Sequence, residues 1–125
     1  MTNSLTKPYV NRVDGLLKSL IGTEDPDDLM LEIMDRLSDT VTPVPDLGNY
    51  YTFVYKAQTP NETYDVHPLI AAMEYTPFGF KGFSFHWDRM RNYNFNGVVG
   101  QLYYVNPEEI DELKTIPYQR FVLNN

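Results

Sequence analysis

The chain of 125 residues contains no cysteine. This absence excludes disulfide bonds, thiolate metal sites and cysteine catalysis, so stability has to come from packing or from partners. Basic residues are also few, since ten Lys and Arg stand against 17 Asp and Glu, for a formal net charge of −7. Because capture of a phosphate backbone depends on clustered Lys and Arg, this balance disfavours general DNA or RNA binding.

Long apolar runs are missing as well. No stretch approaches the roughly 20 apolar residues that cross a bilayer, and residues 1–8 lack the charged-then-apolar pattern of a secretion signal. We therefore expect no membrane partner, and a protein that is used in a reducing cytoplasm or built into a particle assembled there. A chain of this length suits one domain with one core.

Aromatic residues are abundant. Fifteen of the 18 lie between Tyr50 and Tyr104, in a stretch punctuated by glycine. A single ring can bury roughly 150–250 Å², so this range is expected to hold the core. Ten of the aromatic residues are Tyr, whose hydroxyl needs water or a partner, which places several of them at the rim of the core or at a contact surface.

The first forty residues predict two short amphipathic helices. The first ends at Gly22, and the second begins after Asp25 with Pro26 at its first position. Neither helix would be stable alone in water, so each must pack on the rest of the chain or on a neighbouring subunit. The apolar stripes are Val13, Leu16, Leu17, Leu20 and Ile21 in the first helix, and Met30, Ile33, Met34, Leu37 and Val41 in the second.

The periodicity changes to that of strands after a linker stiffened by Pro43 and Pro45. We expect strands over residues 49–56, 68–75, 80–87, 98–105 and 118–123, a polar loop over 88–96, and a helix over 107–115 with a capping box. In the third strand, Phe83, Phe85 and Trp87 should face the core, and His86 should be exposed.

This order predicts an α+β, mainly β fold: a small SH3-like antiparallel barrel of about five strands, preceded by two short N-terminal helices. Residues 1–47 would form the helical arm and its proline-containing linker, and residues 48–125 the barrel. An open antiparallel sheet with the helices on one face is the alternative.

Residues typical of catalysis or metal binding are sparse. His67 and His86 each lie two positions from an acid, Asp65 and Asp88 respectively, which on a strand would place each pair on one face. A metal or acid-base site needs more than one such pair, and hydrogen bonding near the sheet edge explains both histidines more simply. We therefore expect no enzyme activity and no cofactor.

Single-stranded nucleic acid, or a DNA end, is the alternative ligand. A small barrel with exposed rings can stack bases, and Lys81, Arg89 and Arg91 could hold the phosphates. The net charge of −7 opposes this interpretation.

Three segments resemble a family of small structural proteins of tailed bacteriophages. They are the aromatic strand at residues 48–55, the turn Tyr64-Asp65-Val66-His67-Pro68-Leu69, and Gly79-Phe80-Lys81-Gly82-Phe83-Ser84-Phe85-His86-Trp87. The family pattern has an aromatic residue before the proline, where this chain has His67, and it does not cover the acidic N-terminal helices. The resemblance spans about forty of the 125 residues.

The resemblance implies a virion component of the tail, baseplate or neck, without catalytic residues. Its partners would be other virion proteins and copies of itself, and it would be assembled in the host cytoplasm. The residues expected to contact partners are Met30, Met34, Leu37, Tyr64, Asp65, His67, His86, Arg89 and Arg91.

Overall fold

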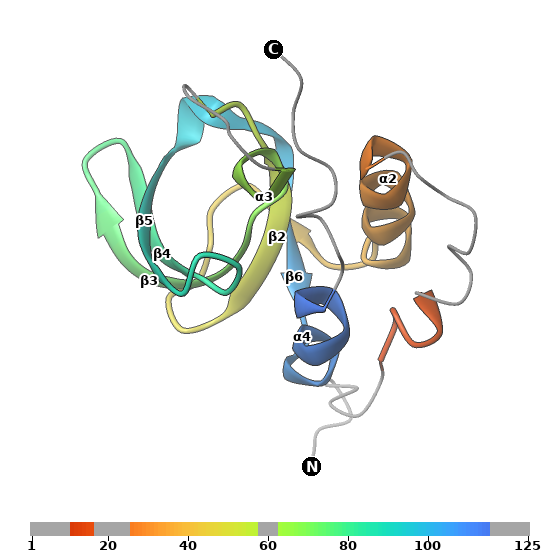
Figure 1. Ribbon diagram of the computed structural model, residues 1–125. Helices are drawn as coiled ribbons and strands as arrows, with labels where there is room; N and C mark the ends of the chain where they lie inside the picture. The colour runs from red at the N-terminus through yellow and green to blue at the C-terminus, as the bar shows by residue number, and fades with distance from the viewer. Residues whose placement is uncertain (1–10, 17–25, 58–62, 116–125) are drawn as a thin grey trace.

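The computed structural model describes residues 11–16, 26–57 and 63–115 (Figure 1). The helices are α2 (Pro26–Arg36), α3 (Thr63–Val66), α4 (Pro107–Lys114) and the 3₁₀ helix η1 (Phe95–Gly97). The strands are β1 (Val41–Thr42), β2 (Tyr50–Tyr55), β3 (Leu69–Thr76), β4 (Gly79–Ser84), β5 (Arg89–Asn94) and β6 (Val98–Val105). Most of the first expected helix and the whole of the expected strand 118–123 lie outside the described residues.

The six strands form one antiparallel sheet in the order β1-β6-β2-β3-β4-β5. Its register shifts between Thr52 and Val54 and between Ala72 and Glu74, and such irregularities increase the bend and twist of a sheet. The sheet curls so that β5 comes round towards the chain that follows β2 (Figure 1). The mainly β, antiparallel architecture is thus confirmed, but within the described residues no strand ladder closes the sheet, which is open with β1 and β5 at its edges.

Strand β5 corrects one prediction, because residues 88–96 were expected to form a polar loop. In the sequence Arg89-Met90-Arg91-Asn92-Tyr93-Asn94 only Tyr93 is buried. The strand exists because all six residues pair with β4, from Ser84 opposite Arg89 to Gly79 opposite Asn94. Pairing with a neighbour therefore overrides the weak strand preference of Arg and Asn.

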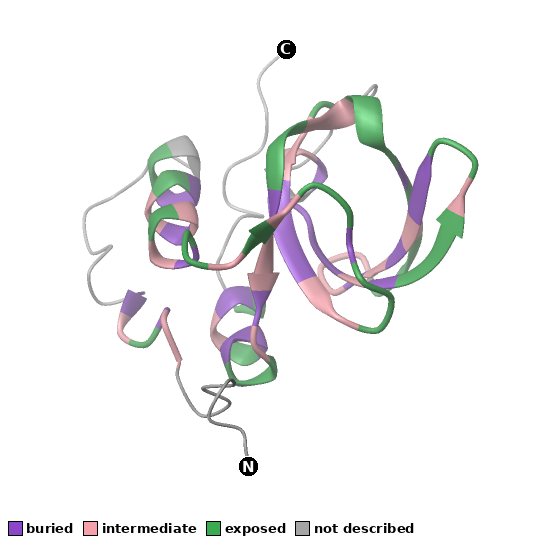
Figure 2. Ribbon diagram, turned by 180° about the vertical axis from the view of Figure 1, so that it is seen from behind, coloured by how far each residue is buried: buried purple, intermediate pink, exposed green. Residues whose placement is uncertain are grey.

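Two hydrophobic clusters lie on opposite faces of β2. Tyr51 and Phe53 point into the curve of the sheet, where they pack with a group of buried residues: Ile70, Ala72, Phe80, Tyr93 and Leu102. Tyr50 and Val54 face the other way, towards a cluster formed by α2, α4 and residues 11–16. Figure 2 shows the buried segments along the inside of the curved sheet and between it and the helices. Residues 1–47 and 48–125 thus share one of the two clusters.

Helix α2 is shorter than expected. It ends at Arg36, and Val41 lies in β1, opposite Tyr103 of β6, with 44% of its surface exposed. The prediction that Val41 continues the helical stripe is therefore wrong. The linker that contains Pro43 and Pro45 follows directly from β1, because Thr42 pairs with Leu102.

The face of β4 that packs into the curve of the sheet is the opposite of the one expected, although Phe85, just after the strand, packs against the helical cluster as predicted. Phe80 is fully buried in the curve of the sheet, and Gly82 and Ser84 are buried, whereas Phe83 is only partly buried. Gly82 explains the difference: a Cβ atom at this position would lie 3.0 Å from Ile70, so the glycine lets β3 and β4 pack tightly on their inner face.

Helix α4 begins as predicted, with Asn106 as N-cap and Glu109 completing the capping box. The carboxylate of Glu109 is fully buried and accepts hydrogen bonds from Arg12 Nε at 2.8 Å, Arg12 Nη2 at 2.8 Å, and the backbone N–H groups of Arg12 and Asn106 at 2.7 Å each. Burial lowers the pKa of Arg12, but its hydrogen bonds to Glu109 and Asp39 outweigh this, so the pKa is raised overall. This network ties residues 11–16 to α4.

Candidate functional site

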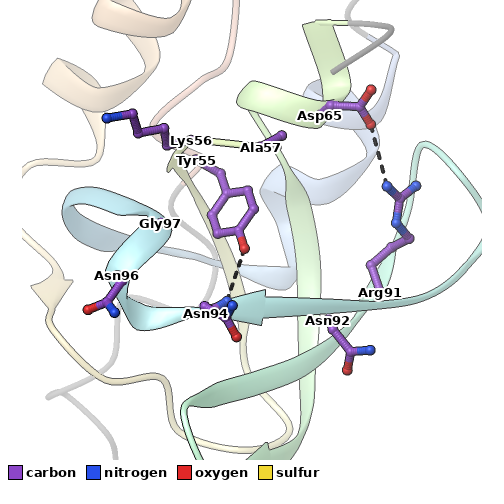
Figure 3. A pocket seen from close by; sticks show the side chains of 9 residues that line it. All are labelled: Tyr55, Lys56, Ala57, Asp65, Arg91, Asn92, Asn94, Asn96 and Gly97. Carbon is purple, nitrogen blue, oxygen red and sulfur yellow. Dashed lines mark hydrogen bonds and ion pairs between the residues drawn. The ribbon is translucent and has the colours of Figure 1, made fainter. Parts of the chain in front are cut away.

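A polar pocket of about 520 Å³ lies beside β5 (Figure 3). The end of β2 and the residues after it form one side, β5 and η1 form another, and α3 contributes Asp65. Its lining residues are Tyr55, Lys56, Ala57, Asp65, Arg91, Asn92, Asn94, Asn96 and Gly97. These side chains supply both charges and several amide groups, which suits recognition of a polar ligand.

Asp65 is the anchoring acid of this pocket. Its side chain is 5% exposed, and its Oδ1 atom accepts a hydrogen bond of 3.0 Å from the indole Nε1 of Trp87. The same oxygen lies 3.7 Å from Nη2 of Arg91, whose side chain is 34% exposed. The burial of Asp65 is therefore compensated by a hydrogen bond and by a nearby positive charge.

Two guanidinium groups lie against Trp87. The Cζ atoms of Arg89 and Arg91 are 5.7 Å and 5.5 Å from the centroid of its ring, within the range of a cation–π interaction. Arg89 and Arg91 are two positions apart on β5 and so share one face of that strand. The first half of β5 therefore carries a local concentration of positive charge in a chain that is acidic overall.

Tyr55 holds the far end of the pocket together. Its hydroxyl accepts a hydrogen bond of 3.0 Å from the backbone N–H of Asn94, and the backbone N–H of Lys56 donates to the carbonyl of Gly97 at 2.7 Å. Gly97 is required there because a Cβ atom would lie 2.6 Å from the ring of Tyr55. The Asn94–Tyr55 contact therefore bridges β5 to β2 without forming a strand ladder, and the Lys56–Gly97 contact joins η1 to the chain after β2.

The structure separates the predicted contact residues into two groups. Asp65 and Arg91 lie together at the pocket, and Arg89 joins them through Trp87. Met30 and Leu37 are buried in the chain's own helical cluster, so the prediction that they contact a neighbouring subunit is wrong for these two residues.

Two other predicted contact residues, Met34 and Tyr64, lie on helices. Met34 is partly buried against the same helical cluster as Met30 and Leu37. Tyr64 belongs to α3, and the structure does not describe its side chain.

Neither His67 nor His86 lies on a strand, so the spacing of two from Asp65 and Asp88 does not place either pair on one strand face. Asp65 lies in a helix, so a spacing of two no longer places it beside His67, which is buried. His86 is partly buried, which corrects its assignment as an exposed residue, and Asp88 lies at an exposed turn with φ of 56°. Burial lowers the pKa of His86 to about 4, and a hydrogen bond with the backbone of Leu113 raises it only in part.

Sequence reasoning missed the amide residues of the pocket. Asn92, Asn94 and Asn96 were assigned to a polar loop, yet the alternation of Arg89 and Arg91 with Met90 and Asn92 has a period of two. A period of two indicates a strand, but here nearly all of the alternating residues are polar, so the usual alternation of apolar and polar residues is absent. Trp87 was assigned to the core, whereas it is only partly buried and binds Asp65.

Among the described residues, no group of three or more His, Asp or Glu side chains is placed to hold a metal ion. Within the same part of the chain, no helix combines the length and the apolar character needed to cross a membrane. No family model matches the chain, and comparisons with curated proteins and with solved structures likewise found no match.

Proposed function

We propose that this protein is a structural component of a tailed bacteriophage particle, in the tail, baseplate or neck, and acts through protein–protein contacts. The resemblance of residues 48–87 to small phage structural proteins supports this assignment. The curl of the sheet supports a related interpretation, that of an SH3-like barrel whose seam beside β5 carries no strand ladder.

The observation that carries the proposal is the β3–β4 hairpin. Phe78 at its turn is 79% exposed, and Met73 and Tyr75 of β3 are 53% and 49% exposed. Exposing three large apolar side chains on one hairpin is unfavourable for an isolated protein, and such surfaces are typical of sites that a partner covers. The hairpin projects from the end of the sheet distant from the helices (Figure 1).

Purified phage particles provide the direct test. A phage that encodes this chain should contain it in particles purified by density gradient, as measured by mass spectrometry. Substituting Phe78→Ser should abolish incorporation, because it removes the most exposed ring of the hairpin. Leu31→Ser is the matched control: Leu31 is 59% exposed on α2, so this variant changes a similar amount of apolar surface elsewhere. Absence of the wild-type protein from the particles would refute the proposal.

Single-stranded nucleic acid or a DNA end remains the alternative ligand, because Arg89 and Arg91 flank an aromatic ring. However, both guanidinium groups already lie against Trp87, and the buried carboxylate of Asp65 binds its indole. A base stacking on Trp87 would have to displace these cations. Salt-dependent binding of an oligothymidine would favour this alternative, and its absence would remove it.

A further inference from the structure

We propose that the free edge of β5 binds an extended acidic segment of a partner protein, which adds to the sheet as a further strand. This inference goes beyond the proposed function, because it defines a surface and the chemistry of its ligand and does not require the partner to be a virion protein. It rests on the hydrogen-bond pattern of β5, the adjoining pocket and the charges along the strand.

The hydrogen bonds at the end of β5 define which backbone groups point outwards. The N–H of Phe95 points towards β4 and donates to the carbonyl oxygen of Phe78 at 3.0 Å. The N–H of Asn94 points to the opposite side and donates to the hydroxyl of Tyr55. Because backbone direction alternates along a strand, the N–H and C=O groups of Asn92 and Met90 also point away from β4.

These outward groups form an unpaired edge. Strand β5 is the last strand in the sheet order, and within the described residues neither Met90 nor Asn92 has a backbone hydrogen bond on the outer side. An edge with free N–H and C=O groups is a template for strand addition. The pocket of about 520 Å³ lies along this edge, with Asn92 and Asn94 on its wall, and leaves room beside the strand.

The side chains of β5 select the charge of the added strand. Arg89 and Arg91 project from one face, and Met90, which is 45% exposed, projects from the other. Residues that pair directly across two strands have their side chains on the same face. A complementary segment therefore places Asp or Glu opposite the arginines and an apolar residue opposite Met90, so acidic and apolar residues alternate along it.

A second copy of the chain does not fit this edge. Consider two copies that pair symmetrically and antiparallel through the outward positions. If Met90 lies opposite Asn92 of the other copy, Arg91 lies opposite Arg91. If Met90 lies opposite Met90, Arg89 lies opposite Arg91. Like charges directly opposite one another destabilise a sheet. Moving the register to include Asn94 requires breaking its hydrogen bond to Tyr55.

A designed peptide tests the proposal directly. The probe is a fluorescein-labelled ten-residue peptide of alternating Glu and Val, titrated with the full chain and followed by fluorescence polarisation. Binding should weaken as salt is added, because the Glu–Arg pairs are exposed. A peptide of alternating Lys and Val should not bind. Failure of the Glu/Val peptide to bind at millimolar concentration, or tighter binding of an oligothymidine, overturns the proposal.

Backbone methylation of the peptide separates strand addition from simple charge attraction. One version carries N-methyl groups on the Val residues and another carries them on the Glu residues. Only one set of amides points at β5, the Val set for an antiparallel strand and the Glu set for a parallel strand. Loss of binding for one version alone supports the proposal, whereas equal affinities for the two versions overturn it. This measurement leaves the protein unaltered.

Variants of β5 provide the matching test on the protein. Asn92→Pro should abolish peptide binding, because it removes an outward N–H while leaving the ladder to β4 intact, and Asn92→Ala, which keeps the N–H, should bind normally. Arg89→Glu should weaken binding about five- to tenfold, whereas Lys114→Glu, which makes the same charge change on α4, should not. Equal binding by Asn92→Pro and Asn92→Ala would refute strand addition.

Discussion

The buried ion pair between Arg12 and Glu109 gives the sharpest stability prediction. Glu109→Gln keeps the shape of the side chain but removes its charge and turns one of its two acceptor oxygens into a donor. The carboxylate is fully buried, the Arg12 side chain is 11% exposed, and four N–H groups converge on the two oxygens. Gln would face these donors with an NH₂ group, so one or more hydrogen bonds would be lost.

The expected cost follows from this geometry. Removing one partner of a buried, hydrogen-bonded ion pair costs about 3–5 kcal/mol, because the other charge stays buried without compensation. Arg12 keeps its ion pair with Asp39 at 2.7 Å, which places the loss near the lower limit, about 3 kcal/mol. A folded domain is stable by only about 5–15 kcal/mol, so this is a large fraction of the total.

Urea unfolding measures this loss. The fluorescence of Trp87, the single tryptophan, reports the transition. With an m-value of about 2 kcal/mol/M, the midpoint should fall by about 1.5 M. Asp39→Asn is the control, because the Asp39 side chain is 70% exposed and its loss should cost under about 1 kcal/mol. A shift for Glu109→Gln no larger than that for Asp39→Asn would refute the reasoning.

A double variant tests whether the charges are coupled. Arg12→Met combined with Glu109→Met should cost less than the sum of the two single substitutions, because no unpaired buried charge remains. Additive losses would mean that the two side chains stabilise the fold independently.

Three further predictions concern other parts of the core. The folded-state pKa of His86, about 4, lies below its unfolded value of 6.5, so the unfolded chain binds a proton more readily. The free energy of unfolding is therefore highest above pH 6.5 and decreases as the pH falls towards 4. This loss amounts to roughly 3 kcal/mol, and urea midpoints of His86→Gln should depend less on pH in that window. Phe53→Ala, which empties the centre of the curved sheet, should cost about 3–5 kcal/mol by urea unfolding, whereas Leu31→Ala on an exposed face should cost under about 0.5 kcal/mol. Gly82→Val should lower the free energy of unfolding by about 1–3 kcal/mol, because the valine side chain would collide with Ile70. The melting temperature should fall accordingly, and an unchanged melting temperature would contradict the close packing of β3 and β4.

Local signals predicted several elements well. The capping box at Asn106 and Glu109 predicted the start of α4, and strand periodicity over residues 49–56 predicted β2. These signals worked because they depend on neighbours in sequence, namely a cap for free N–H groups and a period of two.

The candidate site was predicted only in part. Asp65, Arg89 and Arg91 were named as contacts, but their meeting at Trp87 depends on α3 coming close to β5 in space. The same limit explains the wrong face for β4. Two alternating faces both carry aromatic residues there, and only the close approach of Gly82 to Ile70 decides which face lies inside.

The sequence by itself determined the composition of this protein, which has no cysteine and an acidic N-terminal part. It also determined the fold class, because the aromatic range has the periodicity of strands and the flanking segments that of short helices. Tertiary structure alone decided that a strand as polar as β5 exists, that Glu109 is buried against Arg12, and that the helical stripe of Met30 and Leu37 packs inward. The physical reason is that each of these features gains its stability from residues distant in sequence. Local propensity does not contain that contribution.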